Sequence, residues 1–304
     1  MDPSSPLSVR TAPVPHVRHG ILMLIVAVSF FALLDTTCKW LSQTYPVPMI
    51  VWARYSAQTL LMLLVLGPQL RFGLLRTRAL GMQVVRGLVL LIVSVMFLYA
   101  LSLMPIAEAT AISFMAPLLL TMLSVMVLRE YVPRGAWLAV TAGFIGVLII
   151  VRPGGALFTP VVIIPIVSAF FYAVYQLLTR KMAGIDPTLT TLFYGCLVGT
   201  ILLSLAVPFF WVAPISLLHA VMLLTTGVLG GMGHFMLIRA FESAPASVLA
   251  PFLYVQLVIV TGIGYLVFDA FPDSWSLVGM AIIVISGAWV AAQHRRAPAS
   301  PTTA

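Results

Sequence analysis

Two related stretches decide the fold of this 304-residue chain: FFALLDTTCK at residues 30–39 and FYAVYQLLTR at residues 171–180. They align at an offset of 141 residues, which places Asp35 opposite Gln176. The same repeat pairs Arg86-Gly87-Leu88 with Thr226-Gly227-Val228, and residues 100–105 with residues 240–245. Self-similarity at a nearly constant offset indicates that the chain is an internal duplication.

The composition shows which solvent surrounds the duplicated halves. Hydrophobic residues make up 62% of the chain and charged residues only 8%, against about 45–50% and about 25% in soluble domains. A helix that spans a bilayer needs about 20 mainly apolar residues. The sequence therefore excludes an ordinary soluble enzyme and predicts a protein that crosses the membrane many times.

Ten apolar runs, bounded by charges or by Pro and Gly, predict ten helices. They cover residues 20–41, 48–67, 82–103, 106–128, 135–151, 159–179, 187–207, 216–238, 245–267 and 274–292. Each copy of the repeat holds five runs, and an odd number of spans makes the second copy enter the membrane from the opposite side. The predicted fold is therefore an all-α polytopic membrane protein of ten transmembrane helices, arranged as two inverted five-helix repeats.

The basic residues predict the orientation and explain the net charge of +8. The predicted helices place twelve basic residues on one side of the membrane: Arg10, Arg18, Arg71, Arg76, Arg78, Arg129, Arg134, Arg180, Lys181, Arg239, Arg295 and Arg296. Only Arg152 falls on the other side, so the positive-inside rule places both termini in the cytoplasm of a bacterium, with the helices in its inner membrane. Because topology accounts for the charge, nucleic acid is not a predicted partner. The predicted domains are a cytoplasmic tail at 1–19, repeats at 20–151 and 159–292, and a cytoplasmic tail at 293–304.

Motifs of catalysis and of ATP hydrolysis are missing from the sequence. It holds no G-x-S-x-G, no H-E-x-x-H and no G-x-x-x-x-G-K-[ST] pattern. Cys38 and Cys196 lie inside apolar runs without metal-ligand spacing. We therefore predict that the chain is not an enzyme and needs no cofactor or metal; an intramembrane enzyme is the distant alternative.

Burying an ionisable side chain within a membrane span costs free energy, so each such residue is a candidate functional residue. Asp35 lies near the middle of the first span and is a candidate for proton coupling and for binding a substrate amine. The alternative is that Asp35 and Lys39, one helical turn apart, neutralise each other. Arg54 is a candidate for binding an anionic substrate group, or for pairing with Asp35. For Arg86 we expect an anchor at the headgroups or at a neighbouring helix end.

Two further ionisable residues have structural explanations that suffice. Glu108 begins a span, where a carboxylate favours the positive end of the helix dipole. His234 lies among glycines, and a hydrogen bond that holds its ring in place is the simpler role, with a proton relay as the alternative.

Uncharged candidates complete the predicted binding site. They are Trp52, Tyr99, Tyr172, Gln176, Tyr254 and Gln256. Together with Asp35 and Arg54 they would suit a planar or aromatic metabolite that carries an acidic group. Filling of the core or of the interfacial belts is the alternative role of the aromatic residues.

A longer pattern runs through the first half of the chain. It comprises Arg86-Gly87, Tyr99-Ala100-Leu101, Pro105-Ile106-Ala107, Ala111, Pro117, Leu128-Arg129-Glu130 and Gly143-Phe144-Ile145-Gly146-Val147. This pattern, which recurs in the second half, resembles the EamA-type family of the drug/metabolite transporter superfamily over about residues 20–290. Two departures in the second half, an early proline at Pro251 and Phe268-Asp269 in place of Gly-Glu, look more like the branch that carries S-adenosylmethionine and riboflavin.

The resemblance implies a secondary transporter with its substrate bound between the two halves, working by alternating access. The cargo would be a small organic metabolite. An exporter of amino-acid-like or metallophore compounds and an importer of a vitamin or nucleoside-type metabolite are the alternatives. Small residues on the fifth and tenth runs, Ala142, Gly143, Gly146, Ser286, Gly287 and Ala288, permit either a homodimer or tight packing within one protomer.

Overall fold

The computed structural model describes residues 17–71, 73–128, 134–152, 159–182, 184–244, 249 and 252–296. This part of the chain is almost entirely helical and contains no strand. Its helices are α1 (Val17–Leu41), α2 (Val47–Gln69), η1 (Gly73–Leu75), α3 (Leu80–Leu103), α4 (Ile106–Ser113), α5 (Ala116–Leu128), α6 (Arg134–Val151), η2 (Pro160–Val162), α7 (Ile163–Lys181), α8 (Thr188–Ala206), η3 (Val207–Phe209), α9 (Leu217–Ser243), α11 (Val255–Phe268) and α12 (Ser274–Arg296). Most of the two predicted tails, residues 1–16 and 297–304, lies outside the described residues.

The helices have the length and polarity of a multi-pass membrane protein. Among the described residues, seven segments are long and apolar enough to cross a bilayer. Three shorter apolar helices accompany them: Val140–Val151, Val255–Phe268 and Ser274–Trp289. The described chain is thus an all-helical membrane protein.

The predicted helix at 106–128 is interrupted, which corrects the sequence prediction. α4 ends at Ser113, and α5 begins only at Ala116. Pro117 has no N–H to donate to Ser113, and its ring crowds the carbonyl of that residue, which favours a kink or a break in the helix. The backbone instead tightens, because the Met115 N–H donates to the carbonyl of Ile112 at 3.0 Å. Pro117 itself is tolerated in the first turn of α5.

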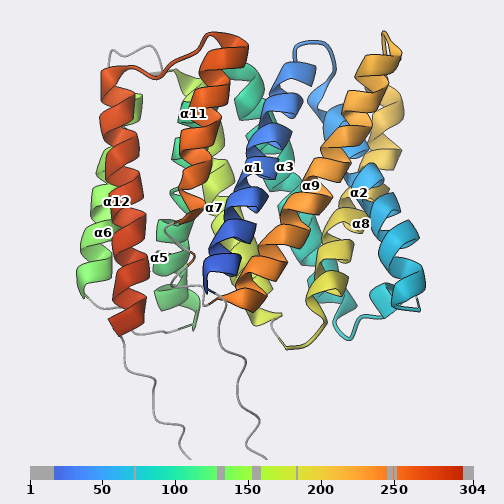
Figure 1. The fold of residues 1–304 in the computed structure, drawn as a ribbon, viewed down its shortest axis with the longest axis horizontal. Coiled ribbons are helices and arrows are strands. Elements are labelled where there is room, and N and C mark those ends of the chain that lie inside the picture. The colour runs from blue at the N-terminus through green and yellow to red at the C-terminus, as the bar shows by residue number, and fades with distance from the viewer. Residues whose placement is uncertain are drawn as a thin grey trace, which may run out of the picture.

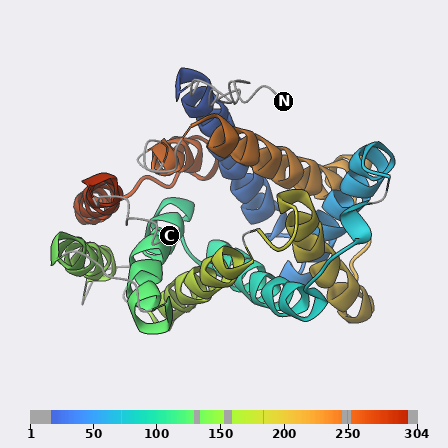
Figure 2. The same cartoon turned by 90° about the horizontal axis from the view of Figure 1, so that it is seen from below.

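Helices of the first half pack against helices of the second half in matched pairs. Three contacts between the halves each have an equivalent. The contact of α1 with α9 matches that of α7 with α3, the contact of α2 with α9 matches that of α8 with α3, and the contact of α1 with α11 matches that of α7 with α5. The pairs α2 with α8 and α6 with α12 join equivalent helices of the two halves. Seen from below, α6 and α12 lie together at one end of the molecule and α2 and α8 at the other (Figure 2).

Equivalent helices run in opposite directions. Near the end of α1, Lys39 Nζ donates to the carbonyl of Leu101 near the end of α3, at 2.6 Å. Near the end of α7, Tyr175 instead meets Arg86 in the early part of α3. α1 is therefore parallel to α3 while α7 is antiparallel to it, as the ribbon in Figure 1 shows.

Glycines let the central helices approach closely. A Cβ atom at Gly227 of α9 would lie 2.5 Å from the Cβ of Ala57 and 2.7 Å from the carbonyl oxygen of Arg54, both on α2. A Cβ at Gly146 of α6 would lie 2.8 Å from the carbonyl oxygen of Gly279 on α12. The small residues at these crossings therefore serve packing within the protomer.

The two ends of the molecule carry different charge. The basic face is the end where α1 begins and α2 ends; it carries Arg18, Arg71, Arg76, Arg78, Lys181 and Arg239. The opposite face is the end where α6 ends and α12 begins, and Arg152 lies there (Figure 1).

Equivalent residues connect the halves at both faces. At the basic face, the Asp186 carboxylate accepts hydrogen bonds from Thr77 Oγ1 at 2.5 Å, Arg78 N at 2.9 Å and Gln83 Nε2 at 2.9 Å. At the opposite face, the equivalent residue is Tyr45. Its hydroxyl accepts from the Ile215 N–H at 3.1 Å and lies 3.1 Å from Nδ1 of His219. Each connection thus joins a loop of one half to the start of a long helix in the other.

Arg86 connects three helices inside the basic half of the bundle. Its side chain is fully buried and donates to the Tyr175 hydroxyl at 2.8 Å, to Thr179 Oγ1 at 3.3 Å and to the carbonyl of Thr191. The guanidinium also lies over the Tyr175 ring, 5.0 Å from its centre. Arg86 therefore binds helix ends, one of the two roles expected from the sequence.

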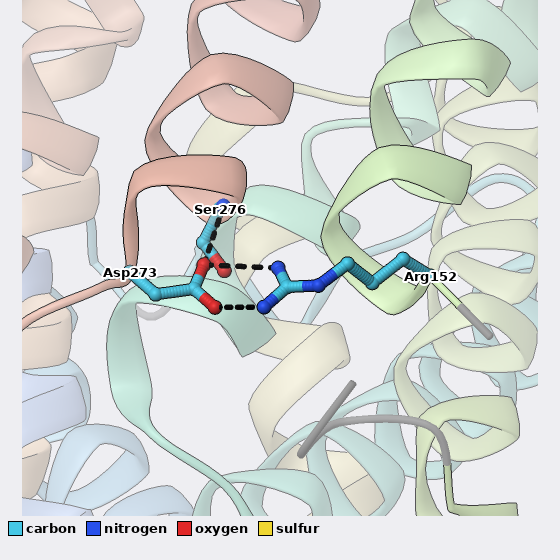
Figure 3. A network of polar contacts seen from close by, with 3 residues as sticks. All are labelled: Arg152, Asp273 and Ser276. Carbon is cyan, nitrogen blue, oxygen red and sulfur yellow. Dashed lines mark hydrogen bonds and ion pairs between the residues drawn. The ribbon is translucent and has the colours of Figure 1, made fainter. Parts of the chain in front are cut away.

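An ion pair joins α6 to α12 at the opposite face (Figure 3). The two terminal guanidinium nitrogens of Arg152 donate to Asp273, one of them at 3.2 Å. Asp273 also accepts the Ser276 N–H at 2.7 Å, and so caps the first turn of α12. The hydrogen bonds from Arg152, followed by the one from Ser276, lower the pKa of Asp273 below its ordinary value.

We predict that this ion pair contributes its full stability above about pH 4 and loses it progressively at lower pH. A carboxylate whose pKa is lower in the folded state adds stability above its unfolded pKa of about 3.9, and this stability is lost as the pH falls through the folded pKa. Arg152→Gln should lower the unfolding temperature in detergent at pH 7, and the difference from the wild type should shrink steadily as the pH falls below about 4. A difference that does not change with pH would contradict the prediction.

We also predict that Arg86→Gln destabilises the protein by about 1–3 kcal/mol, because it leaves buried hydrogen-bonding groups on α7 and α8 without partners. Thermal unfolding in detergent measures the effect. Arg71→Gln, which removes the same charge from an exposed position, is the control and should stay within about 0.5 kcal/mol of the wild type. Equal effects of the two changes would show that the network adds no stability.

Candidate functional site

Asp35 on α1 is held by the second half of the protein. Its carboxylate is 9% exposed and accepts a hydrogen bond from Gln256 Nε2 at 3.2 Å. Gln256 is the second residue of α11, which begins in the middle of the apolar run predicted at 245–267. The first turn of a helix is its positive end, and half-helices of this kind present that end to negative charge. Asp35 therefore lies beside the first turn of α11.

Arg54 on α2 lies at a similar depth. Asp35 is six residues before the end of α1 and Arg54 seven residues after the start of α2, which is about 9 Å and about 10 Å from the same face at 1.5 Å per residue. The Arg54 guanidinium is close enough to act electrostatically on Asp35, Tyr172 and His234. Among the described residues it has no ion-pair partner, and its buried Nε atom has no hydrogen-bond partner. One acidic and one basic group thus share a region without direct neutralisation.

Lys39 does not neutralise Asp35. Its amino group donates to the carbonyls of Leu101 at 2.6 Å and Met104 at 2.9 Å, at the end of α3. It also lies over the Phe268 ring, 5.3 Å from its centre. A lysine at this position satisfies carbonyl groups that have no partner in the last turn of a helix. The local Asp35–Lys39 pair considered from the sequence is therefore not formed.

Aromatic side chains lie on two sides of this region. The rings of Tyr172 and Tyr175 on α7 stack at 5.8 Å with an interplanar angle of 11°, and Tyr172 is 40% exposed. Tyr254 is buried and packs on Phe114 at 5.0 Å. Phe114 follows α4 and Tyr254 precedes α11, so two equivalent positions at helix ends meet at this contact. Gln176 is half-buried one turn after Tyr172.

Trp52, one of the predicted site residues, faces a different part of the bundle. Trp52 donates from Nε1 to Ser204 Oγ at 2.9 Å and packs on Trp211 at 6.0 Å. Positions two apart on a helix point about 200° apart, so Trp52 faces away from Arg54. Tyr99 is 49% exposed on α3. Within the described ranges, no hydrogen bond, ion pair or ring contact joins Trp52 or Tyr99 to Asp35 or Arg54.

Gln58 is a residue that the sequence reasoning missed. It is 1% exposed, one turn after Arg54, and its Nε2 atom has no hydrogen-bond partner. A Cβ at Gly230 of α9 would lie 3.1 Å from Gln58 Oε1 and 3.6 Å from Arg54 Nε. The spacing of Arg54 and Gln58, four residues apart in an apolar run, was the available signal. Both side chains therefore meet the glycine-rich surface of α9.

The other ionisable residues of the spans lie around this site. Glu108 is buried in the first turn of α4, as expected, and its Oε2 atom has no hydrogen-bond partner. His234 on α9 is half-buried, and its ring packs on Phe31 at 5.0 Å. Within the described chain, no three His, Cys, Asp or Glu side chains are placed to hold a metal ion together.

Known proteins share this sequence pattern over most of the chain. An S-adenosylmethionine uptake transporter of Rickettsia prowazekii is 31% identical over 211 residues, which cover 69% of this chain and 71% of the relative. A riboflavin transporter of Vibrio cholerae is 30% identical over 281 residues, 90% of this chain and 93% of that one. A pseudopaline exporter of Pseudomonas aeruginosa is 28% identical over 274 residues, 89% of this chain and 95% of the relative.

The fold also has a solved counterpart. A crystal structure superimposes with a TM-score of 0.63 at 19% sequence identity, over 92% of this chain and 99% of that chain. The sequence profile described as the EamA-like transporter family matches twice, at residues 18–152 and at residues 159–292. The two matches fall on the two halves that enclose Asp35 and Arg54, and the chain therefore belongs to the EamA-like transporter family.

Proposed function

We propose that this protein is a secondary transporter of the bacterial inner membrane that moves a small organic metabolite by alternating access. Its ten helices would form two inverted halves, residues 20–151 and 159–292, with both termini in the cytoplasm. The observation that carries the proposal is the hydrogen bond between Asp35 of the first half and Gln256 of the second. A polar contact between the halves, with Arg54 nearby, fits a substrate site that both halves share.

The chemistry of the site favours a zwitterionic metabolite with a planar ring. Asp35 can pair with a cationic group and Arg54 with a carboxylate or phosphate. The exposed face of Tyr172, stacked on Tyr175, offers a surface for a flat ring. S-adenosylmethionine has all three features, and riboflavin has the planar ring. Uptake of a nucleoside-like or vitamin-like metabolite is therefore the leading proposal, and export of an amino-acid-like or metallophore compound is the second.

Proton coupling through Asp35 is the proposed source of energy. The sequence has no Walker motif, so the chain itself has no predicted means of ATP hydrolysis. Asp35 is a buried acid without a basic partner in direct contact, because Lys39 is bound to the end of α3. In the proposed cycle, Asp35 binds a proton on the outer side and releases it to the cytoplasm as the substrate enters, so that the inward proton gradient drives uptake.

We predict that Asp35→Asn abolishes transport driven by a proton gradient and leaves the protein folded. Purified protein in liposomes would be given labelled S-adenosylmethionine or labelled riboflavin, with and without an imposed pH gradient. The wild type should accumulate one of them. Asp35→Asn should lose at least about 90% of gradient-driven uptake, because Asn cannot carry a proton. Exchange at equal pH should survive if the carboxylate only carries the proton.

Asp269→Asn is the matched control. Asp269 is exposed and lies at φ 52°, a left-handed conformation that Asn also accepts, so this variant should transport like the wild type. Loss of exchange in Asp35→Asn would assign Asp35 to substrate binding or gating. Unchanged pH dependence in that variant would contradict proton coupling, and a wild type that moves neither compound would contradict the proposed substrate class.

The proposed orientation has its own test. We predict that a cysteine at Gln43, in the connection of α1 to α2, reacts with an impermeant thiol reagent from outside the cell. A cysteine at Arg76, on the basic face, should react only after the membrane is opened. Cys38 and Cys196 are buried and give little background. The reverse pattern of labelling would contradict the orientation.

A further inference from the structure

A hollow on the basic face lies between the two halves. It has a volume of about 570 Å³ and is lined by the connection of α2 to α3 and by the connection of α7 to α8. Gly73 and Gly184 form part of its wall, and a Cβ at either glycine would have no atom within 4 Å. The hollow is therefore open to solvent, and no other atoms crowd its two glycines.

The hollow carries more positive than negative charge, because Arg76 and Arg78 line it together with the single carboxylate of Asp186. Both arginines are exposed. Their guanidinium groups donate no hydrogen bond to any described residue, although that of Arg78 is close enough to act electrostatically on Asp186. The Asp186 carboxylate is already occupied by hydrogen bonds from Thr77, Arg78 N and Gln83. Two guanidinium groups thus remain able to bind an anion, and Arg suits the oxygens of a phosphate.

Apolar side chains beside the hollow indicate where the anion comes from. Leu75 is 48% exposed and Leu80 is 56% exposed, on either side of the two arginines in the sequence. Ile185 of the second half lines the hollow and is also exposed. These residues lie where the membrane spans α2, α3 and α8 end or begin. A ligand that joins an anionic head to apolar chains matches this surface better than a free anion does.

We propose that the hollow binds the phosphate group of an anionic phospholipid. Arg76 and Arg78 bind the phosphate oxygens, and the acyl chains run along Leu75 and Leu80. The bound lipid contacts both connections next to Asp186, so it reinforces the junction of the two halves at this face. A free phosphate ion and a phospholipid would both bind the arginines through phosphate oxygens. Only the phospholipid would also use the apolar residues beside the hollow. This site lies apart from Asp35 and Arg54 and does not depend on the transported substrate.

Lipid binding to the full-length protein in detergent tests the proposal. Native mass spectrometry would compare phosphatidylglycerol with phosphatidylcholine, and inorganic phosphate and glycerol 3-phosphate would be added as competitors. In this proposal both guanidinium groups contact the phosphate, and charge-assisted hydrogen bonds of this kind are the strong ones. The double variant Arg76→Gln and Arg78→Gln should therefore bind phosphatidylglycerol at least about tenfold more weakly than the wild type and bind phosphatidylcholine unchanged.

The double variant Arg18→Gln and Arg71→Gln is the matched control, because it removes two charges from the same face but outside the hollow. It should bind phosphatidylglycerol like the wild type. Equal losses of phosphatidylglycerol binding in the two double variants would show that the lipid is attracted by the general surface charge and not by a site, and would overturn the proposal. Equal binding of the two lipids by the wild type would also overturn it. Displacement of the lipid by inorganic phosphate at similar concentration would overturn the assignment to a phospholipid.

Discussion

The low dielectric of the bilayer is the constraint on which the rest of this structure depends, because a polar group inside a span must find its partner within the chain. Arg86 and Lys39 meet that requirement through backbone carbonyls at helix ends. Asp35 meets it through a side chain of the other half. Arg54 and Gln58 keep buried nitrogen atoms without partners. Arg86 Nε also lacks a partner, so Arg54 and Gln58 are distinguished by their place against the glycine-rich surface of α9 and not by unpaired atoms alone.

Equivalent positions in the two halves make the same kind of contact between the halves, but with different side chains. Asp186 and Tyr45 both precede a proline and both connect the halves, one through a carboxylate and the other through a phenol. Phe114 and Tyr254 meet at equivalent helix ends. Packing thus follows the repeat closely, while polar side chains depart from it.

That difference is where a transport site can arise. Asp35 and Gln176 occupy equivalent positions, and only the first is ionisable. A site that combines one acid with one base cannot follow the two-fold symmetry of the repeat. The duplication therefore provides two matched sets of helices, and substitutions in single copies provide the chemistry between them.

The sequence by itself determined the helical membrane character, the two halves and the opposite orientation of equivalent helices, because hydrophobic run length and repeat offset are local properties of a chain. It also predicted Asp35, Arg54 and Gln256 as polar groups within spans. It did not predict the break after Ser113, since a proline inside an apolar run is compatible with a kinked helix as well as a broken one.

Only the tertiary structure decided which of these side chains meet. Asp35 and Gln256 are far apart in the chain, and the packing of α1 on α11 brings them together. Lys39 is one turn from Asp35 and still binds α3, because the carbonyls at the end of α3 lie nearer in space than the sequence can show. Trp52 faces α8 because helix rotation is set by all the helices packed around α2. Which partner a polar side chain binds depends on all the groups that the assembled bundle brings near it. The sequence of a single helix does not contain that information.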